Sequence, residues 1–332
     1  MFYNFINRYD VFDFLKKGNK AIRKILRYAV FKHEKRVQQV YSSIEYYPTN
    51  WWDIPEVTSR WNQLMTGSKE IDYYSYVSKQ YFNSKNNLIG LSLGCGTGYR
   101  ELRWLQVLKM RAFDAIDLSE HSIAVAKQAA QKNGVDHILK YRVEDINKIT
   151  LQQNFYDVIV VEQSLHHFTP LLEIMKKIHA SLKEDGLLVV NEFVGPTRFQ
   201  WTDKQINVIN NLLSILPEKY RKRYNMDSIK TRIFRPSILR MMLSDPSESV
   251  ESSNILPFLN EIFTIVEYKE YGGTILQMLF AEIAHNFISD DILAKKWISL
   301  FFEIEDILLK EKEITSDFIF AVCKKKVIPS DL

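Results

Sequence analysis

The sequence predicts an α/β protein with a doubly wound, mostly parallel sheet. Short apolar runs alternate with helical patterns through the middle of the chain, and one of these runs ends in a glycine-rich turn. Polar residues follow several of the runs, where a parallel sheet would present them at one edge. The chain of 332 residues is 46% hydrophobic, so it can build the buried core that such a sheet needs.

The run Leu88–Leu93 predicts a short buried strand, and it ends in the sequence GCGTG at residues 94–98. A helical pattern follows at once over residues 100–110. Glycines in such a turn reach positive φ and expose backbone N–H groups, which can face a ligand together with the helix N-terminus. A dinucleotide-binding turn would carry a third glycine at position 99, where this chain has Tyr99. The turn alone therefore predicts a cofactor site without fixing the cofactor.

Four more strands and two more helices continue the alternation. Strands are expected at 113–118, 138–143, Tyr156–Glu162 and 187–193, and helices at 121–133 and 171–182. Gly134 suits the end of the first of these helices, and the sequence KEDG at 183–186 predicts a turn before the last strand. Ligands of such sheets bind outside the carboxyl ends of the strands, so we expect the functional residues at that edge.

The pattern changes after residue 193. Residues 195–259 are mostly helical and polar by pattern, and their basic cluster at 219–235 suits either a solvated face or an anionic carrier. A strand at 263–268, helices at 275–288 and 291–310, and a strand at 317–324 follow. We divide the chain into a helical, basic and aromatic N-terminal region (1–87), a cofactor-binding core (88–194), a helical lid insertion (195–262) and the last strands of the sheet with a helical insertion (263–332). The aromatic residues at 48–87 are expected to pack in the core or over the cofactor site.

The net charge of +4 is concentrated near the start of the chain. Residues 1–40 contain ten Lys or Arg and three acidic residues, so the rest of the chain is slightly acidic, which argues against a broad nucleic-acid-binding face. This basic arm is amphipathic, and it either packs on the body or docks on an anionic membrane or a partner. Two cysteines, no secretory signal and no apolar run of membrane-spanning length predict a cytoplasmic protein, peripheral at the inner membrane face if the arm docks there.

The GxGxG turn after an apolar strand resembles motif I of the class I S-adenosylmethionine (SAM)-dependent methyltransferases. Asp117 closes the second strand, about 20 residues after the turn, where it suits hydrogen bonds to ribose hydroxyls, although Asp117-Leu118-Ser119 could simply cap the next helix. The resemblance implies a Rossmann-like fold with SAM as cofactor, in which Asp145 and the backbone of Ile146 contact the adenine. Cys95 is expected to contribute its backbone alone. The predicted cofactor-binding residues are Gly94, Cys95, Gly96, Gly98, Asp117, Leu118, Asp145, Ile146 and Gln163.

His166, His167 and Glu192 follow the fourth and fifth strands and are the candidate catalytic residues. An alcohol acceptor must lie in line with the S–CH₃ bond, and it benefits from a base. Histidine is preferred as this base because its pKa suits neutral pH, and Glu192 could orient the imidazole. The sequence shows no compact metal-ligand spacing, so no metal is expected. In the lid, Arg198 and Trp201 are placed to meet the substrate, because Arg binds phosphates and Trp packs on sugar rings.

Five short blocks extend the resemblance beyond the core: WDIP at 52–55, TG at 66–67, GPTRFQWTD at 195–203, DPSE at 245–248 and YGGT at 271–274. They look like blocks shared by bacterial methyltransferases of cell-surface polysaccharide clusters. This narrower resemblance implies O-methylation of a hydroxyl of a sugar, a glycan precursor or a related metabolite. The alternatives are a small-molecule N- or carboxyl-methyltransferase and a non-catalytic SAM-binding partner protein, and no nucleic-acid partner is expected.

Overall fold

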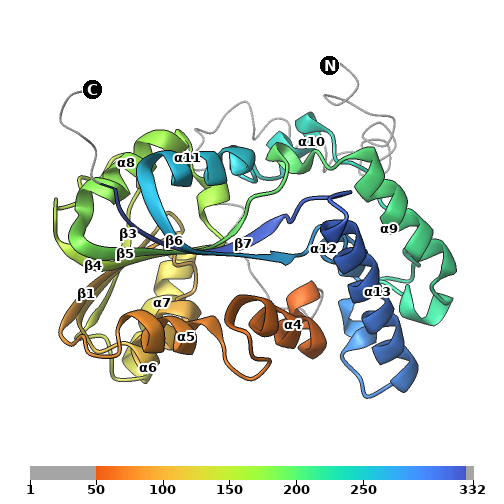
Figure 1. Cartoon of the computed structure of the whole chain (residues 1–332), viewed down its shortest axis with the longest axis horizontal. Helices are drawn as coiled ribbons and strands as arrows, with labels where there is room; N and C mark the ends of the chain where they lie inside the picture. Colours follow the sequence, from red (N-terminus) through yellow and green to blue (C-terminus); the bar gives the residue numbers. More distant parts are fainter. Residues whose placement is uncertain (1–49, 327–332) are drawn as a thin grey trace.

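The computed structural model describes residues 50–326, which form a seven-stranded sheet flanked by helices (Figure 1). The strands lie in the order β3–β2–β1–β4–β5–β7–β6. The first five strands pair in parallel, and β7 runs antiparallel to both β5 and β6. This arrangement confirms the predicted fold class. The strands are β1 Leu88–Leu93, β2 Met110–Asp117, β3 Leu139–Val143, β4 Tyr156–Glu162, β5 Leu182–Phe193, β6 Phe263–Gly272 and β7 Phe318–Lys325.

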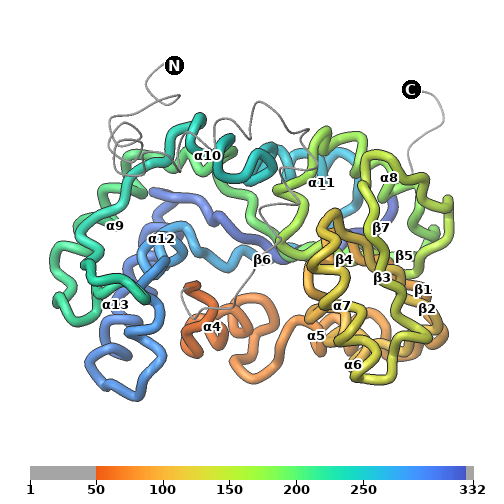
Figure 2. The backbone as a smooth tube through the Cα atoms, turned by 180° about the vertical axis from the view of Figure 1, so that it is seen from behind, coloured from red at the N-terminus to blue at the C-terminus, as the bar shows by residue number. Residues whose placement is uncertain are grey.

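Helices cover both faces of the sheet. The views in Figures 1 and 2 place α4, α5, α6 and α7 on one side and α8 and α11 on the other, while α9, α12 and α13 gather at one end of the molecule. The α-helices are α4 Pro55–Thr66, α5 Tyr73–Tyr81, α6 Tyr99–Val107, α7 Glu120–Lys132, α8 Leu171–Ser181, α9 Asp203–Ile215, α10 Ile238–Ser244, α11 Ile255–Ile262, α12 Leu276–Phe280 and α13 Ile292–Lys310. The 3₁₀ turns that bear on the site are η3 Leu165–His167 and η4 Thr197–Phe199.

The sheet is buried on both faces, which explains why its strands are continuous apolar runs rather than alternating ones. Every residue of β1 is buried. Successive residues of β7 enter different hydrophobic cores, with Phe320 on the side of α4 to α7 and Ala321 on the side of α8 and α11. The two cores hold the carboxyl ends of the central strands in fixed positions.

Local signals set several helix bounds. Pro55 begins α4, and Gly67 ends it with a left-handed φ of 82°. The side chain of Thr202 accepts a hydrogen bond from the backbone N–H of Gln205 at the start of α9, and Gln205 returns a contact to Thr202, which forms a capping box.

Two expected elements differ in the structure. The helix expected at 275–288 is broken after α12, where Glu282 adopts a left-handed φ of 68°, and the chain continues as the 3₁₀ turn η7 Ala284–Phe287. The turn expected at 183–186 lies inside β5: Leu182 pairs with Tyr156 and Leu187 with Val158, so these four residues are an irregularity opposite a single residue of β4. The lid region is helical in α9, α10 and α11 but irregular over 221–236.

The basic arm at residues 1–40 lies outside the described part of the chain, as do the last six residues. The expected docking of the arm therefore stays a prediction. Among the residues that the structure describes, none of the helices combines the length and the apolar character that crossing a bilayer requires. Cys95 and Cys323 are both buried and are not joined to each other.

Candidate active site

The turn between β1 and α6 has three glycines with positive φ: Gly94 at 73°, Gly96 at 53° and Gly98 at 82°. A Cβ on Gly94 would stand 2.5 Å from the Cβ of Ser164, and one on Gly98 would stand 2.4 Å from the hydroxyl oxygen of Tyr141. A Cβ on Gly96 would meet nothing within 4 Å. The two outer glycines are therefore required by close protein neighbours, and Gly96 is the one of the three whose backbone borders open space.

Asp117 ties this turn to the end of β2. Its Oδ2 accepts a hydrogen bond from the backbone N–H of Gly96 at 2.8 Å, and its Oδ1 accepts one from that of Ser119 at 2.8 Å. The side chain that caps α7 belongs to Ser119, which accepts from Ser122 at 3.2 Å. The expected helix cap in the segment Asp117-Leu118-Ser119 is therefore confirmed, with Ser119 as the capping residue, while the contact of Asp117 with a ribose stays a prediction. Leu118, which lies between Asp117 and Ser119 in the sequence, is half-buried.

The segment after β3 lies beside Asp117, because the backbone N–H of Glu144 donates to the Asp117 carbonyl at 3.0 Å. Asp145 accepts a hydrogen bond from the backbone N–H of Asn147 at 2.9 Å, and Ile146 is buried. The structure thus brings the predicted ribose and adenine residues to adjacent strand ends.

Gln163, the residue directly after β4, is in a strained conformation, since its φ of 53° is uncommon for a residue with a side chain. Its backbone N–H donates to the Asn191 carbonyl at 2.8 Å, and its side-chain Nε2 lies 3.3 Å from the Tyr271 hydroxyl. That hydroxyl donates to Asn191 Oδ1 at 2.5 Å. Local strain held by such contacts is typical of functional sites.

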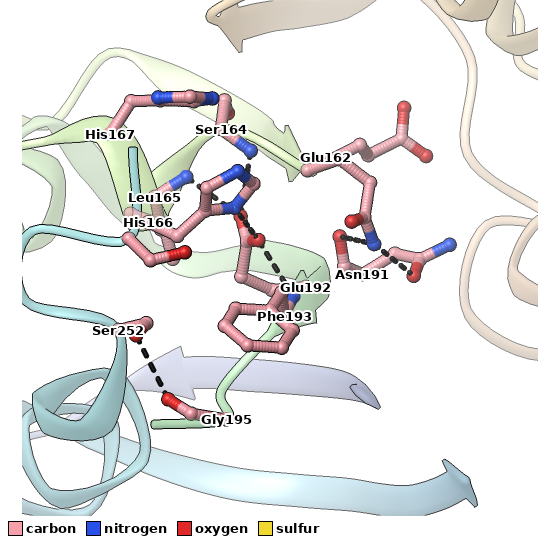
Figure 3. Close-up of polar contacts among 12 residues, drawn as sticks. Glu162, Ser164, Leu165, His166, His167, Asn191, Glu192, Phe193, Gly195 and Ser252 are labelled. Atoms are coloured by element: carbon pink, nitrogen blue, oxygen red, sulfur yellow. Dashed lines mark hydrogen bonds and ion pairs between the residues drawn. The ribbon is translucent and has the colours of Figure 1, made fainter. Parts of the chain in front are cut away.

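Glu192 is fully buried at the end of β5 and organises the chain opposite it (Figure 3). Its Oε2 accepts hydrogen bonds from the backbone N–H groups of Ser164 and Leu165, both at 2.7 Å, and its Oε1 contacts Nδ1 of His166. A carboxylate with these partners fixes the 3₁₀ turn η3 and the orientation of the His166 ring. The structure therefore shows the contact through which Glu192 could orient an imidazole, and it leaves Glu192 itself without access to an acceptor.

The two neighbouring histidines are in different electrostatic environments. Burial lowers the pKa of His166, but the negative charge and hydrogen bond of Glu192, followed by Glu248 and Asp245, outweigh it and raise the pKa above its usual value. Burial, reinforced by the charge of His166, lowers the pKa of His167. Their ring centroids are 4.2 Å apart.

A distant segment, residues 245–250, packs over these histidines. The backbone N–H of Val250 donates to the His166 carbonyl at 3.0 Å, and Oε1 of Glu248 lies 3.6 Å from Nε2 of His166. Nδ1 of His167 lies 3.1 Å from Oγ of Ser247, whose hydroxyl donates to Oδ1 of Asp245 at 2.7 Å. We did not single out these three side chains from the sequence as site residues, because about 80 residues separate them from the histidines.

Of the two lid residues expected to meet substrate, Arg198 lies at this segment. Its backbone N–H donates to the Ser249 carbonyl at 2.7 Å, and its guanidinium donates to the Glu248 carbonyl at 3.1 Å. Trp201 is only 3% exposed and stacks on Phe199, with ring centroids 4.9 Å apart. Trp201 therefore supports the packing of the lid, and Arg198 is the better placed of the two for a substrate.

A buried polar network joins α5 to the end of β4. The Tyr73 hydroxyl donates to Oε1 of Glu162, and the indole N–H of Trp104 donates to its Oε2 at 3.2 Å. Arg100, the second residue of α6, donates to the Glu162 carbonyl at 2.9 Å. The aromatic segment before β1 thus packs in the core directly behind the candidate site.

Cys95 is buried, and burial raises the pKa of its thiol well above the usual value. The thiol is therefore inert at neutral pH.

Comparisons with known proteins agree with this geometry. Residues 84–244 match a family model described as a methyltransferase domain. Malonyl-[acyl-carrier protein] O-methyltransferase from Bacillus cytotoxicus is 36% identical over 110 residues, which are 33% of this chain and 36% of that protein. Ubiquinone biosynthesis O-methyltransferase from Haemophilus ducreyi is 28% identical over 162 residues, which are 46% of this chain and 63% of that protein. This chain therefore spans less than two thirds of the length of either relative.

One solved structure shows the same fold over most of the chain. Geranyl diphosphate C-methyltransferase from Streptomyces coelicolor A3(2), in complex with S-adenosyl-L-homocysteine, aligns with 90% of this chain and 99% of its own, with a TM-score of 0.51 and 10% identity. Residues 84–244 thus match a methyltransferase domain, and the sheet has the Rossmann-like fold of the class I SAM-dependent methyltransferases. The match to the family model ends at residue 244, so the segment over the histidines and the YGGT block lie beyond it.

Proposed function

We propose that this chain is a SAM-dependent methyltransferase that methylates a hydroxyl group of a sugar, a glycan precursor or a related metabolite in the cytoplasm. The observation that carries the proposal is the His166–Glu192 pair beside the glycine turn, at the carboxyl ends of β4 and β5. A buried carboxylate on one ring nitrogen leaves the other nitrogen to serve the acceptor.

The residues at the strand ends fit SAM. Open backbone at Gly96 gives room for a ligand against the turn, and the carboxylates of Asp117 and Asp145 stand at adjacent strand ends. When bound, SAM supplies an electrophilic methyl group on a sulfonium. Gly96 and Gln163 would border its methionine part, Asp117 its ribose, and Asp145 with Ile146 its adenine.

The chain's own task is to hold the acceptor and to take its proton. The acceptor oxygen must lie about 3 Å from the methyl carbon and in line with the S–CH₃ bond. As the new C–O bond forms and the S–CH₃ bond breaks, the hydroxyl proton passes to Nε2 of His166. Glu192 stabilises the resulting imidazolium through Nδ1. Burial around Glu192 and η3 excludes water from this pair.

Three of the blocks behind the narrower resemblance support a sugar or glycan-precursor acceptor, since they converge on the site. Arg198, from the block at 195–203, contacts Glu248 of the block at 245–248, and Tyr271 of the block at 271–274 contacts Asn191. Arg198 would suit a phosphate on the carrier of such a sugar. The basic arm of residues 1–40 would bring the enzyme to a membrane-bound precursor.

A carboxylate acceptor is the second candidate, favoured by the likeness to malonyl-[acyl-carrier protein] O-methyltransferase over 110 residues. Incubation with methyl-labelled SAM and extracts of glycan precursors, followed by mass spectrometry, tests the choice. We expect a labelled product heavier by one CH₂ in the glycan fraction. Label confined to carboxyl esters would overturn the hydroxyl assignment, and no labelled product from any extract would overturn catalysis in favour of a SAM-binding partner protein.

A further inference from the structure

We infer that His166, His167 and Glu248 form a binding site for a divalent transition-metal cation. One ligand-type atom from each of these residues lies within 4.8 Å of the others. The inference goes beyond the proposed function, because Nε2 of His166 cannot hold a cation and take the acceptor proton at the same time. Metal binding itself does not depend on methyl transfer, so the two can be tested separately.

The spacing of the three groups suits a small cation. Nε2 of His166 and Oε1 of Glu248 are 3.6 Å apart. Two ligands of a tetrahedral zinc ion, each about 2.1 Å from the metal, lie about 3.4 Å apart. The three ligand atoms lie within 4.8 Å of one another, so binding of an ion would draw the side chains closer together. Two imidazoles and one carboxylate leave further coordination positions for an acceptor oxygen or water.

Each histidine also has the second contact that metal-binding histidines show. Nδ1 of His166 contacts the Glu192 carboxylate, and Nδ1 of His167 lies 3.1 Å from Oγ of Ser247. That hydroxyl donates its own proton to Asp245, so it accepts from His167. Both Nδ1 atoms therefore carry a ring proton, so that in the neutral form of each ring Nε2 is the atom that can bind a cation.

This tautomer creates a conflict that a cation would resolve. In a neutral His166 the lone pair of Nε2 faces the oxygen of Glu248 at 3.6 Å, and two acceptors at that distance repel unless a proton or a cation lies between them. Carboxylates of Glu192, Glu248 and Asp245 surround the two rings. A divalent ion would compensate this negative charge.

The backbone that carries these ligands is held by several hydrogen bonds. Glu192 fixes η3 through Ser164 and Leu165, and the Val250 N–H binds the His166 carbonyl at 3.0 Å. Arg198 holds the Glu248 carbonyl at 3.1 Å. Preorganised ligands lower the entropy cost of binding an ion. The sequence shows no such spacing because Glu248 reaches the histidines only through the fold.

Titration calorimetry of the full chain with Zn²⁺, without SAM or acceptor, tests the inference. We expect one saturable site, and Glu248→Gln and His167→Ala should each weaken it by about tenfold or more. His137→Ala, which removes an exposed imidazole, is the matched control and should leave the affinity within about twofold. Mg²⁺, which prefers oxygen ligands, should not compete.

Thermal unfolding guards against variants that fail to fold. Zn²⁺ should raise the melting temperature of the natural chain but not that of Glu248→Gln, an isosteric change that keeps the segment intact. Absence of a saturable Zn²⁺ site, or a site that both ligand variants leave unchanged, would overturn the inference. The contact between His166 and Glu248 would then be an ion pair of a protonated imidazole with a carboxylate. Zinc binding without any methylated product would overturn the proposed function and leave the metal site standing.

Discussion

At the scale of single residues, Glu192 is the group on which the candidate site depends. It is 0% exposed, and its two oxygens hold backbone N–H groups and the His166 ring at once. Such a carboxylate cannot itself reach an acceptor. We therefore propose different roles for the three catalytic candidates: Glu192 orients the His166 ring, and His166 takes the acceptor proton, while His167 packs beside it.

His166→Ala tests this division of roles. We expect kcat to fall by about 10²–10⁴-fold, because the group that receives the hydroxyl proton is lost. SAM affinity, measured by calorimetry, should stay within about twofold, since the ring lies beyond the residues assigned to the cofactor. The exposed His121, changed to Ala, serves as the control. A variant that keeps its full rate would contradict the assignment.

At the scale of elements, the lid joins the Rossmann-like core through residues 245–250. Arg198, itself at a left-handed φ of 56°, binds the backbone of this segment at two places. The segment in turn carries Glu248 and Ser247 to the histidines. The lid is therefore part of the site, and its effect should be on the acceptor rather than on SAM.

Arg198→Ala should raise KM for the acceptor by about tenfold, because a charge-assisted hydrogen bond that positions Glu248 is lost. SAM affinity should not change. Steady-state kinetics with each substrate varied in turn measures the split, and Arg111→Ala, on the exposed start of β2, is the control. An equal loss of affinity for both substrates would mean that the lid acts on the whole fold.

The sequence predicted the strands well because buried parallel strands are apolar runs that end in polar residues. For the same reason it placed Gly96, Asp117, Gln163 and Glu192 at one edge. It could not place Glu248, whose approach to His166 depends on the path of the lid. The break after α12 was also hidden, since Glu282 in a left-handed conformation leaves no sequence signal comparable to a glycine.

At the scale of the whole molecule, buried acids connect the last elements to the sheet. Glu305 of α13 accepts hydrogen bonds from the backbone N–H groups of Gly273, Ile275 and Leu276 and pairs with Arg60 of α4 at 3.2 Å. Asp317, just before β7, is 1% exposed, and burial together with the charge of Glu305 raises its pKa to about 8.

The raised pKa of Asp317 predicts that folding stability depends on pH. The folded state binds this proton more tightly than the unfolded chain does, so the stabilisation is complete below about pH 4 and is lost as the pH rises to about 8. Asp317→Asn, which cannot ionise, should reduce the change in the free energy of unfolding across this pH range by a few kcal/mol. Urea unfolding across that range measures it. Burial also raises the pKa of Glu101 to about 7, and this group contributes to the pH dependence equally in the natural chain and in Asp317→Asn. Identical slopes would contradict the prediction.

The central claim is that the carboxyl edge around the glycine turn binds SAM, and calorimetry tests it most directly. The full chain should bind SAM and S-adenosyl-L-homocysteine at one site and should not bind NAD. Asp117→Ala should weaken SAM binding by about tenfold or more, because it removes both the expected ribose contact and the hydrogen bond to Gly96. Asp136→Asn, at an exposed position, should bind SAM normally. Tight binding of NAD without SAM would contradict the account.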